Sequence, residues 1–557
     1  MEKKKKLIVL GVIILLLVAS GLTFAILTWN STMINIGINT NCFTINYAKG
    51  NNISGSLKLI NEEDLINNNK FTIKEGVGVS SVNIGIKSTC SIEGYGNILL
   101  NITNISSVFT TGDSKGALKY VVLKNTSTIT DPTQISTTSL LNQSFDIEKK
   151  GSIDTSDTLK LLTKQLSNTE LYKYIIVIYV DNNLAGNDIT SATFQGNISA
   201  DATQGKLDLA KETLNKLNSL NNTITLASGT PDFTTVSGNN GKDNNGNTGL
   251  GDGTKGIYKA EDDFGTSYYF RGAVDNNYVK FAGLYWRIIR INGDGSIRMI
   301  YAGTSAHANG ESETDSYISK TAYNSSYNDN TYVGYMTGTK GATTYASAHS
   351  NTNNSTIKGV IDTWYKTNIE DKGYSSYVAD AIYCNDRSIA NDSATNTMLT
   401  KKSSSWINTG LGYGTNVTAY GGAKRNWVDH TPSLVCPNDN DKFTIDSTLG
   451  NGKLTYPVAL ITSDEIAYAG GYAYDYNTSS YIANKEFYLH APSYYYWTLT
   501  PWASAGGLSN VADWDTSGLL DWNGVSSTGG AARAVVSLLS DAITGGNGTM
   551  SDPFTVG

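Results

Sequence analysis

The chain has 557 residues, too many for one hydrophobic core, so we expect two or more domains. Charged residues make up only 16%, and the net charge is −7. An acidic chain does not attract nucleic acid electrostatically, so we exclude nucleic-acid partners. The missing charge is replaced by Asn, Ser, Thr, Gly and 34 Tyr, a composition typical of β-rich proteins with solvent-facing surfaces. The composition therefore predicts a mostly β protein with some helix.

The N-terminus predicts a membrane anchor. Residues 1–6 form a basic cytoplasmic tail, and the uncharged run Leu7–Leu27 follows. As a helix this run spans about 31 Å, the thickness of the hydrocarbon core. Because lysines stay on the cytoplasmic side, the rest of the chain is expected outside. A signal peptide cut near Ala19–Ser20 or Ala25 is the alternative. We therefore expect a single-pass protein of the cell membrane whose bulk is extracellular.

The four cysteines fall two and two along the chain. Cys42 and Cys90 lie in the first part, and Cys384 and Cys436 lie in the last part. Pairing within each part is the simplest arrangement for an exported chain. We expect Cys42–Cys90 and Cys384–Cys436 disulfides, with free buried thiols as the alternative.

Residues 30–203 consist of short alternating strands separated by turn clusters, a pattern that predicts a β-sandwich. Two stretches, Tyr174–Asp181 (YIIVIYVD) and Phe194–Gln204 (FQGNISADATQ), look like the closing strands of a known family. On these stretches the segment resembles the TasA/camelysin family of secreted jelly-roll proteins. Members of that family form matrix fibres or remain at the envelope. The resemblance implies a structural or spacer role with self-assembly through this domain, and it brings no catalytic residue.

Residues 204–256 predict a helix and a flexible linker. The stretch 206–220 (KLDLAKETLNKLNSL) places leucines among charges with the spacing of a short amphipathic helix. The tract Ser237–Gly256 (SGNNGKDNNGNTGLGDGTKG) is polar and of low complexity, so it has no apolar area to bury. We place the domain boundary in this tract.

Residues 257–557 predict a second domain of mixed strands and helices. The hairpin signal Asn292–Gly295 (NGDG) joins two apolar runs near its start. Helices are predicted at Ser355–Asn368 and Ser463–Ala469, and a strand at Val535–Leu538.

Three stretches of this domain resemble a known group: Val458–Tyr472 (VALITSDEIAYAGGY), Tyr494–Trp502 (YYYWTLTPW) and Ala531–Leu538 (AARAVVSL). The domain resembles C-type-lectin-like proteins of bacterial and phage surfaces, including retroelement variable proteins and relatives of formylglycine-generating enzymes. It departs from the group's pattern at Thr498 and Thr500, and at Ala534, where the group has Leu, Ser and Pro. The resemblance implies a C-type-lectin-like α+β domain in which residues 302–455 are insertions.

The sequence gives no support for catalysis. The histidines His307, His349, His430 and His490 are far apart and follow no ligand spacing, so we interpret each as a surface or loop residue. The carboxylate–amide pair around a proline that calcium-dependent lectins use does not occur. Gly-x-Ser-x-Gly, His-Glu-x-x-His and phosphate-loop motifs are also missing. We therefore expect no enzyme activity, no cofactor and no metal.

The strongest candidate for a binding site is Ser504–Ser527, predicted as an exposed aromatic and polar loop region. The candidate ligand-binding residues are Asn510, Asp513, Trp514, Asp515, Ser517, Asp521, Trp522 and Asn523. Aromatic rings with small polar neighbours make adaptable contact surfaces. The alternative is that both tryptophans belong to the core. This mixture of groups suits an extracellular glycan and a protein epitope equally.

Together these patterns predict a membrane-anchored surface protein with a lectin-like recognition or adhesion head on a β-sandwich stalk. An extracellular matrix or fibre subunit, in which the first domain assembles, is the alternative. An extracellular enzyme is a third reading.

Overall fold

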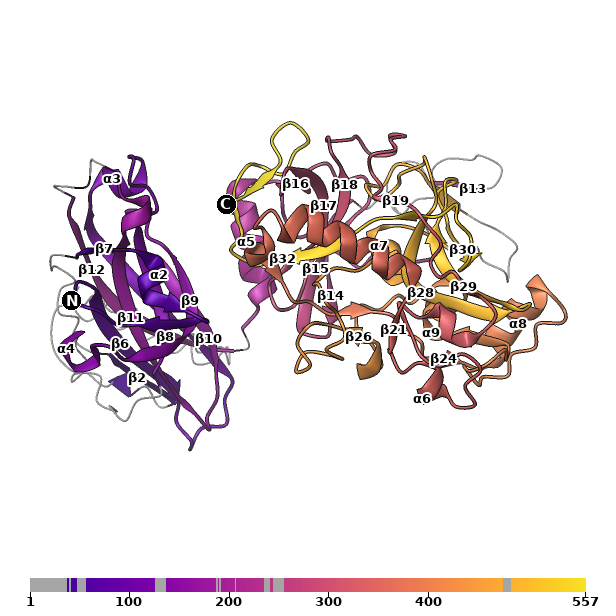
Figure 1. The fold of residues 1–557 in the computed structure, drawn as a ribbon, viewed down its shortest axis with the longest axis horizontal. Helices are drawn as coiled ribbons and strands as arrows, with labels where there is room; N and C mark the ends of the chain where they lie inside the picture. The colour runs from indigo at the N-terminus through magenta and orange to yellow at the C-terminus, as the bar shows by residue number, and fades with distance from the viewer. Residues whose placement is uncertain are drawn as a thin grey trace, which may run out of the picture. The chain divides into compact units, whose positions relative to one another are not determined.

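The computed structural model describes residues 38–39, 42–47, 57–125, 137–186, 189, 192–205, 207–234, 241–243, 255–473 and 482–557. The chain forms two compact units, one ending at Leu207 and one beginning at Asp208 (Figure 1). Strands dominate both units, which confirms the prediction of a mostly β chain.

The predicted fold class is wrong in its N-terminal transmembrane helix. No helix in the described part of the chain combines the length and the apolar character needed to cross a membrane. The predicted anchor itself, residues 7–27, lies outside the described residues. The corrected fold class is a pair of β-rich units.

The first unit contains a nine-stranded and a three-stranded sheet. The larger sheet has the order β1 (Ile38–Asn39), β2 (Phe43–Tyr47), β6 (Gly78–Ile86), β11 (Leu171–Asp181), β8 (Leu118–Lys124), β9 (Ser144–Ser152), β5 (Lys70–Thr72) and β4 (Ile66–Asn67), with β3 (Leu59–Ile60) pairing with β11. The smaller sheet has the order β10 (Leu159–Leu166), β7 (Gly94–Ile105) and β12 (Phe194–Gln204). Short helices are α2 (Glu62–Leu65), α3 (Ser107–Thr110) and α4 (Thr137–Leu140), with a 3₁₀ turn at Asn182–Leu184.

Strand β11 explains how the first unit folds, because both of its faces are buried. Ile176 and Ile178 belong to a core that the two sheets share. The alternate residues Ile175 and Val177 belong to a second core on the opposite face of the larger sheet. Side chains of a strand alternate between faces, so the unbroken apolar run of β11 supplies both cores.

The disulfide Cys42–Cys90 is present, as predicted. Strands β2 and β6 pair in antiparallel fashion with Phe43 opposite Ile86, and the Lys87 amide donates to the Cys42 carbonyl. The two cysteines therefore lie at the same end of neighbouring strands, within reach of each other.

The second unit is built on a nine-stranded and a seven-stranded sheet. The first of these has the order β22 (Val378–Ala379), β32 (Val535–Leu538), β18 (Ile297–Gly303), β17 (Leu284–Ile291), β16 (Tyr278–Phe281), β34 (Phe554–Val556) and β33 (Ile543–Gly545), extended by β14 (Gly256–Asp262) and β15 (Gly265–Arg271). The other has the order β19 (Ser319–Lys320), β31 (Ala531–Ala532), β28 (Tyr496–Ala505), β25 (Thr418–Tyr420) and β24 (Ile389–Ala390), extended by β29 (Leu508–Trp514) and β30 (Leu520–Gly524). Three strand pairs complete the described strands: β13 (Gly241–Asp243) with β27 (Ile482–Asn484), β20 (Met336–Thr337) with β21 (Asn353–Asn354), and β23 (Tyr383–Cys384) with β26 (Lys442–Phe443).

Most helices of the second unit begin at residues with capping side chains. They are α5 (Leu209–Leu220), α6 (Tyr345–Ala348), α7 (Thr356–Tyr365), α8 (Ser393–Lys402), α9 (Gly421–Lys424) and α10 (Ser463–Ala469), with short 3₁₀ segments at Asn330–Val333, Ser375–Tyr377 and Asp439–Asp441 and π segments at Lys366–Glu370 and Arg425–Asp429. Helix α10 has a capping box, in which Thr462 accepts from the Glu465 amide and Glu465 accepts from the Thr462 amide. These local signals explain why α10 has the predicted bounds.

Helix α5 belongs to the second unit, so the chain divides before this helix and not in the tract 237–256. Asp208 caps its first turn by accepting from the Lys211 amide. Its apolar face, with Leu214 and Leu217, joins the large core of the second unit. Of the predicted linker, only Gly241–Asp243 and the last two residues are described, and Gly241–Asp243 forms β13.

The second disulfide, Cys384–Cys436, is also present, as predicted. Replacing both cysteines by alanine is expected to lower the free energy of unfolding of the second unit by about 2–4 kcal/mol, because the unfolded chain loses a cross-link. Tryptophan fluorescence during denaturant unfolding measures this, since every tryptophan except Trp29 lies in the second unit. The matched variant, alanine at Cys42 and Cys90, should leave the tryptophan transition in place. Equal transitions for both variants would contradict the expectation.

Candidate ligand-binding site

The predicted loop Ser504–Ser527 is a three-stranded meander and not an exposed loop. Strand β28 turns at Gly506 into β29, and β29 turns after Trp514 into β30. Only the two turns reach the surface fully, because the strands pack on the core of the second unit. The strands carry polar as well as apolar residues, and both kinds are buried. From the sequence alone such a strand cannot be told from a polar loop.

Three of the eight predicted binding residues are buried. Trp514 is a core residue, and its indole N–H donates to Nδ1 of His490 over 3.1 Å. The Asn510 amide donates to the Ala503 carbonyl across the hairpin at 3.2 Å. Burial raises the pKa of the Asp513 carboxyl well above its usual value, and Asp521 adds to this effect, although a hydrogen bond from Asn523 opposes it. For Trp514 the alternative assignment to the core is therefore the correct one.

The other five predicted residues are half-buried. Asp515 accepts from the amides of Ser517 and Leu519 and so closes the β29–β30 turn. Asn523 donates to Asp513 over 2.7 Å, and Asp521 lies directly opposite Asp513 in the strand register. These polar groups mainly hold the meander together. Trp522 is the one whose ring takes part in a different arrangement.

Trp522 belongs to a cluster of three tryptophans from separate parts of the chain. Its ring stacks on buried Trp502 of β28, with centroids 4.3 Å apart and an interplanar angle of 14°. Half-buried Trp406, four residues beyond α8, meets Trp522 edge-on at 6.2 Å. Trp502 covers one face of the Trp522 ring. The ammonium of the exposed Lys402 lies over the other face, 4.9 Å from the ring centroid.

The hairpin between β28 and β29 completes this surface. A Cβ on Gly506, whose φ is +62°, would lie 2.9 Å from the Trp406 ring, so glycine is needed for the hairpin to cross it. Leu508 is 40% exposed and packs near Gly524 of β30. We call Trp406, Trp522, Leu508 and Lys402 the aromatic face. It borders a small notch whose lining includes the exposed polar side chains of Asn328 and Thr415.

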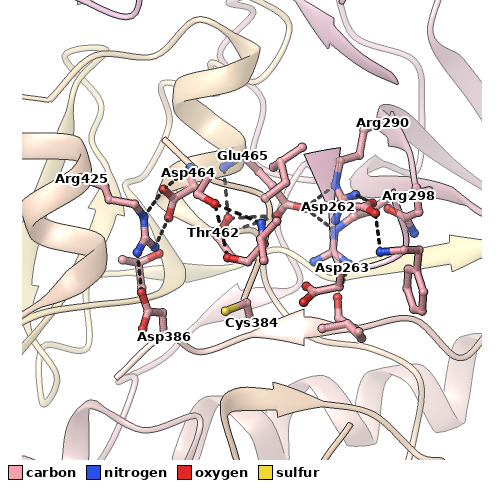
Figure 2. Close-up of a pocket in the computed structure, with 17 residues that line it drawn as sticks. Asp262, Asp263, Arg290, Arg298, Cys384, Asp386, Arg425, Thr462, Asp464 and Glu465 are labelled. Atoms are coloured by element: carbon pink, nitrogen blue, oxygen red, sulfur yellow. Dashed lines mark hydrogen bonds and ion pairs between the residues drawn. The ribbon is translucent and has the colours of Figure 1, made fainter. Parts of the chain in front are cut away.

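A second candidate is the charged cavity shown in Figure 2. Arg290 and Arg298 both contact Oε1 of Glu465, at 3.2 and 2.5 Å, and Arg290 also pairs with Asp262. Burial alone would raise the pKa of the Glu465 carboxyl, but Arg298 and Arg290 outweigh burial and hold it below its usual value. Across the cavity, Arg425 makes two parallel bonds to Asp464 and one to Asp386.

This charged cavity is a structural cross-link, not a ligand site. Its volume is about 30 Å³, room for roughly one water molecule. Each charged group that lines it already has a partner of opposite charge; Asp263, for example, pairs with Lys442 at 3.3 Å. The network ties strands β14, β17 and β18 to α10. The cavity is too small for anything much larger than water.

An open groove lies between the end of α5 and the C-terminal loops, with a volume of about 590 Å³. Among the described residues, Leu220 is its one apolar side chain, and its polar groups bond to each other: Asn221 donates to the Asn547 carbonyl, and Asn276 donates to Thr223. No aromatic side chain from the described part of the chain lines it, whereas ligand pockets are lined mainly by hydrophobic and aromatic side chains. The aromatic face is the better candidate.

All four histidines lie outside the helices and strands, as expected of surface or loop residues. Two of them, His349 and His490, are nevertheless buried. His349 donates to the Gly412 carbonyl, and His490 accepts from Trp514. His307 and His430 are half-buried.

Comparisons with known proteins identify no relative: no family model matches the chain, and no curated protein or solved structure matches it.

Proposed function

We propose that this chain is an exported recognition protein whose second unit binds a carbohydrate at the aromatic face. The observation that carries the proposal is the pair of half-buried tryptophans, Trp406 and Trp522, whose rings pack on each other and on buried Trp502. The two disulfides favour an extracytoplasmic location, because such bonds persist in oxidising compartments.

The chemistry of the aromatic face suits a sugar ring. The C–H groups of a sugar are apolar and pack on an indole, while its hydroxyls need donors and acceptors nearby. Asn328 and Thr415 in the adjoining notch offer both. Lys402 covers the outer face of the Trp522 ring, and a long exposed lysine leaves such a position at little cost. A ligand that displaces Lys402 thus gains a rigid aromatic surface.

A binding role is preferred over catalysis because the charged cavity is internally paired and water-sized. The fibre-subunit alternative and the resemblances to jelly-roll and lectin-like families stay predictions.

Replacing Trp522 by alanine is expected to weaken carbohydrate binding at least about tenfold, since truncating a central tryptophan typically costs about 2 kcal/mol or more. Full-length protein on a glycan array identifies the sugars, and titration of the best one gives the affinities. Replacing Lys402 by alanine should preserve or tighten binding, because it uncovers the ring.

Trp364→Ala serves as the matched control. Trp364 is also half-buried in the second unit, but its ring packs on Trp286 and Tyr301, outside the aromatic face. The Trp364→Ala variant should be less stable than wild type but should bind the sugar with the same affinity. Equal affinities of Trp522→Ala and wild type would overturn the proposal, and so would an array on which no glycan binds while a protein ligand does.

A further inference from the structure

The loop that follows β18 gathers metal-ligating side chains. Between Gly303 and Ser319 it carries His307, Glu311, Glu313 and Asp315. The ligand atoms of His307, Glu311 and Glu313 all lie within 4.8 Å of one another. None of these residues takes part in the aromatic face or the charged cavity.

The His307 ring is held in one orientation. Its Nε2 lies 2.6 Å from Oδ1 of Asp315. Asp315 is itself fixed, because its Oδ2 accepts from the Thr304 amide at 2.9 Å and from the Thr304 hydroxyl at 2.7 Å. A histidine whose one nitrogen bonds a carboxylate presents the other nitrogen to a metal, an arrangement common around zinc. In this loop the nitrogen that remains is Nδ1.

The separation of Nδ1 from the Glu311 carboxylate fits two ligands of one metal ion. Oε2 of Glu311 lies 3.8 Å from Nδ1, too far for a hydrogen bond. Two ligand atoms on one zinc ion, each bonded at about 2.1 Å, lie roughly 3–4 Å apart. Glu311 is kept there by the Ala308 amide, which donates to the same oxygen at 2.8 Å.

Glu313 is the third potential ligand of the group. Its side chain is half-buried, yet within the described residues it makes no hydrogen bond and no ion pair. The carboxylate of Glu313 is therefore available to a cation shared with Glu311 and His307.

The backbone around the site is also fixed in advance. Gly303 has φ +133°, and a Cβ there would lie 3.0 Å from both Asp315 Oδ2 and His307 Nε2. Glycine therefore permits the close approach of this pair. The hydroxyl of buried Tyr278 donates to the His307 carbonyl at 2.8 Å, which anchors the loop to β16.

We infer that His307 Nδ1, Glu311 and Glu313 bind a divalent first-row transition ion, with Zn²⁺ the best match, and that Asp315 positions the histidine. Imidazole with carboxylates favours Zn²⁺ over Ca²⁺ or Mg²⁺, which prefer oxygen ligands alone. Three protein ligands leave a position for water. All three ligands lie in this loop, so the ion would fix the conformation of the loop.

Untagged full-length protein, stripped with a chelator, tests the inference by calorimetric titration with Zn²⁺ and by absorption after loading with Co²⁺. We expect one equivalent of Zn²⁺ and visible Co²⁺ bands of nitrogen and oxygen ligation. His307→Gln and Glu313→Gln should each remove this binding. Asp315→Asn should keep the stoichiometry and weaken affinity about 10–100-fold, as loss of a supporting carboxylate does.

His430→Gln and Glu370→Gln are matched controls, because both residues lie in the second unit outside this loop. They should bind Zn²⁺ like wild type. Melting temperatures measured in chelator show whether each variant is folded. If His307→Gln unfolds, the double variant Glu311→Gln/Glu313→Gln replaces it, because it removes two ligands and leaves the His307–Asp315 contact in place. Wild type that binds no more Zn²⁺ than this double variant would overturn the inference.

Discussion

Replacing Glu465 by glutamine is expected to destabilise the second unit by about 3–5 kcal/mol, the usual cost of stranding a buried charge. Glu465 is the carboxylate that both Arg290 and Arg298 contact, and all three side chains are buried. Glutamine keeps the size and the Thr462 cap but removes the charge. Within the described part of the chain, Arg298 would then keep its bond to the Ile382 carbonyl at 3.2 Å and its contact with the Tyr383 ring, but no carboxylate. Denaturant unfolding followed by tryptophan fluorescence measures the loss.

Glu370→Gln provides the comparison for a surface ion pair. Glu370 is exposed and lies 3.9 Å from exposed Lys366, so this substitution should leave the unfolding midpoint unchanged. If Glu465→Gln behaved like Glu370→Gln, the charged cavity would not be the cross-link that we describe.

The second large effect is a loss of stability in mild acid caused by His349 and His490. Burial, with Arg387 nearby, lowers the pKa of His349 to about 3. Burial, with Lys485 and Arg533 nearby, lowers the pKa of His490 to about 4. In the unfolded chain both titrate near 6.5, so below that pH the unfolded state binds more protons and gains stability. Each histidine should therefore lower the free energy of unfolding by about 2 kcal/mol between pH 7.5 and pH 5.

Unfolding at pH 7.5 and pH 5.0 of wild type and of His349→Gln/His490→Gln tests this. The double variant is expected to be less stable than wild type at pH 7.5. Between pH 7.5 and pH 5.0 its free energy of unfolding should fall much less than that of wild type. Asp513 acts in the opposite sense, since its raised pKa makes the folded state bind a proton, but this contribution is common to both proteins. The same pH dependence in both proteins would contradict the assignment.

Features governed by local chemistry could be predicted from the sequence. Helix α10 has its predicted bounds because Thr462, Glu465 and Gly470 mark its ends. The turn Asn292–Gly295 joins β17 to β18 as the pattern NGDG predicts. Both disulfides follow from the distribution of the cysteines.

Features governed by tertiary packing were mispredicted. Residues of β29 alternate Ala512 and Trp514 with Val511 and Asp513, and all four are buried because the strand lies inside the unit. The pattern of polar residues and glycines indicated a loop, since sequence does not show that a buried carboxyl will find a neighbour such as Asn523. Helix α5 was expected to pack on a neighbouring domain, but its amphipathic pattern does not say which one, so the boundary was placed after it and not before it.

The aromatic face was found only in part. Trp522 was among the candidates, but Trp406 and Lys402 lie more than a hundred positions earlier, and no spacing connects them. The sole local signal is a tryptophan at the end of a polar run, Ser403–Trp406 (SSSW). The His307 site was missed for a different reason. The spacing between histidines does not show it, because the loop uses one histidine with glutamates four and six residues later.

The central claim is that the aromatic face binds the ligand, and fluorine NMR of protein labelled with 5-fluorotryptophan tests it most directly. The nine tryptophans give separate signals that single Trp→Phe variants assign. On addition of the best sugar from the array, the signals of Trp406 and Trp522 should shift and saturate together. Those of Trp286 and Trp427, which are fully buried and outside this cluster, should stay in place. A saturable shift confined to tryptophans other than Trp406 and Trp522 would contradict the account.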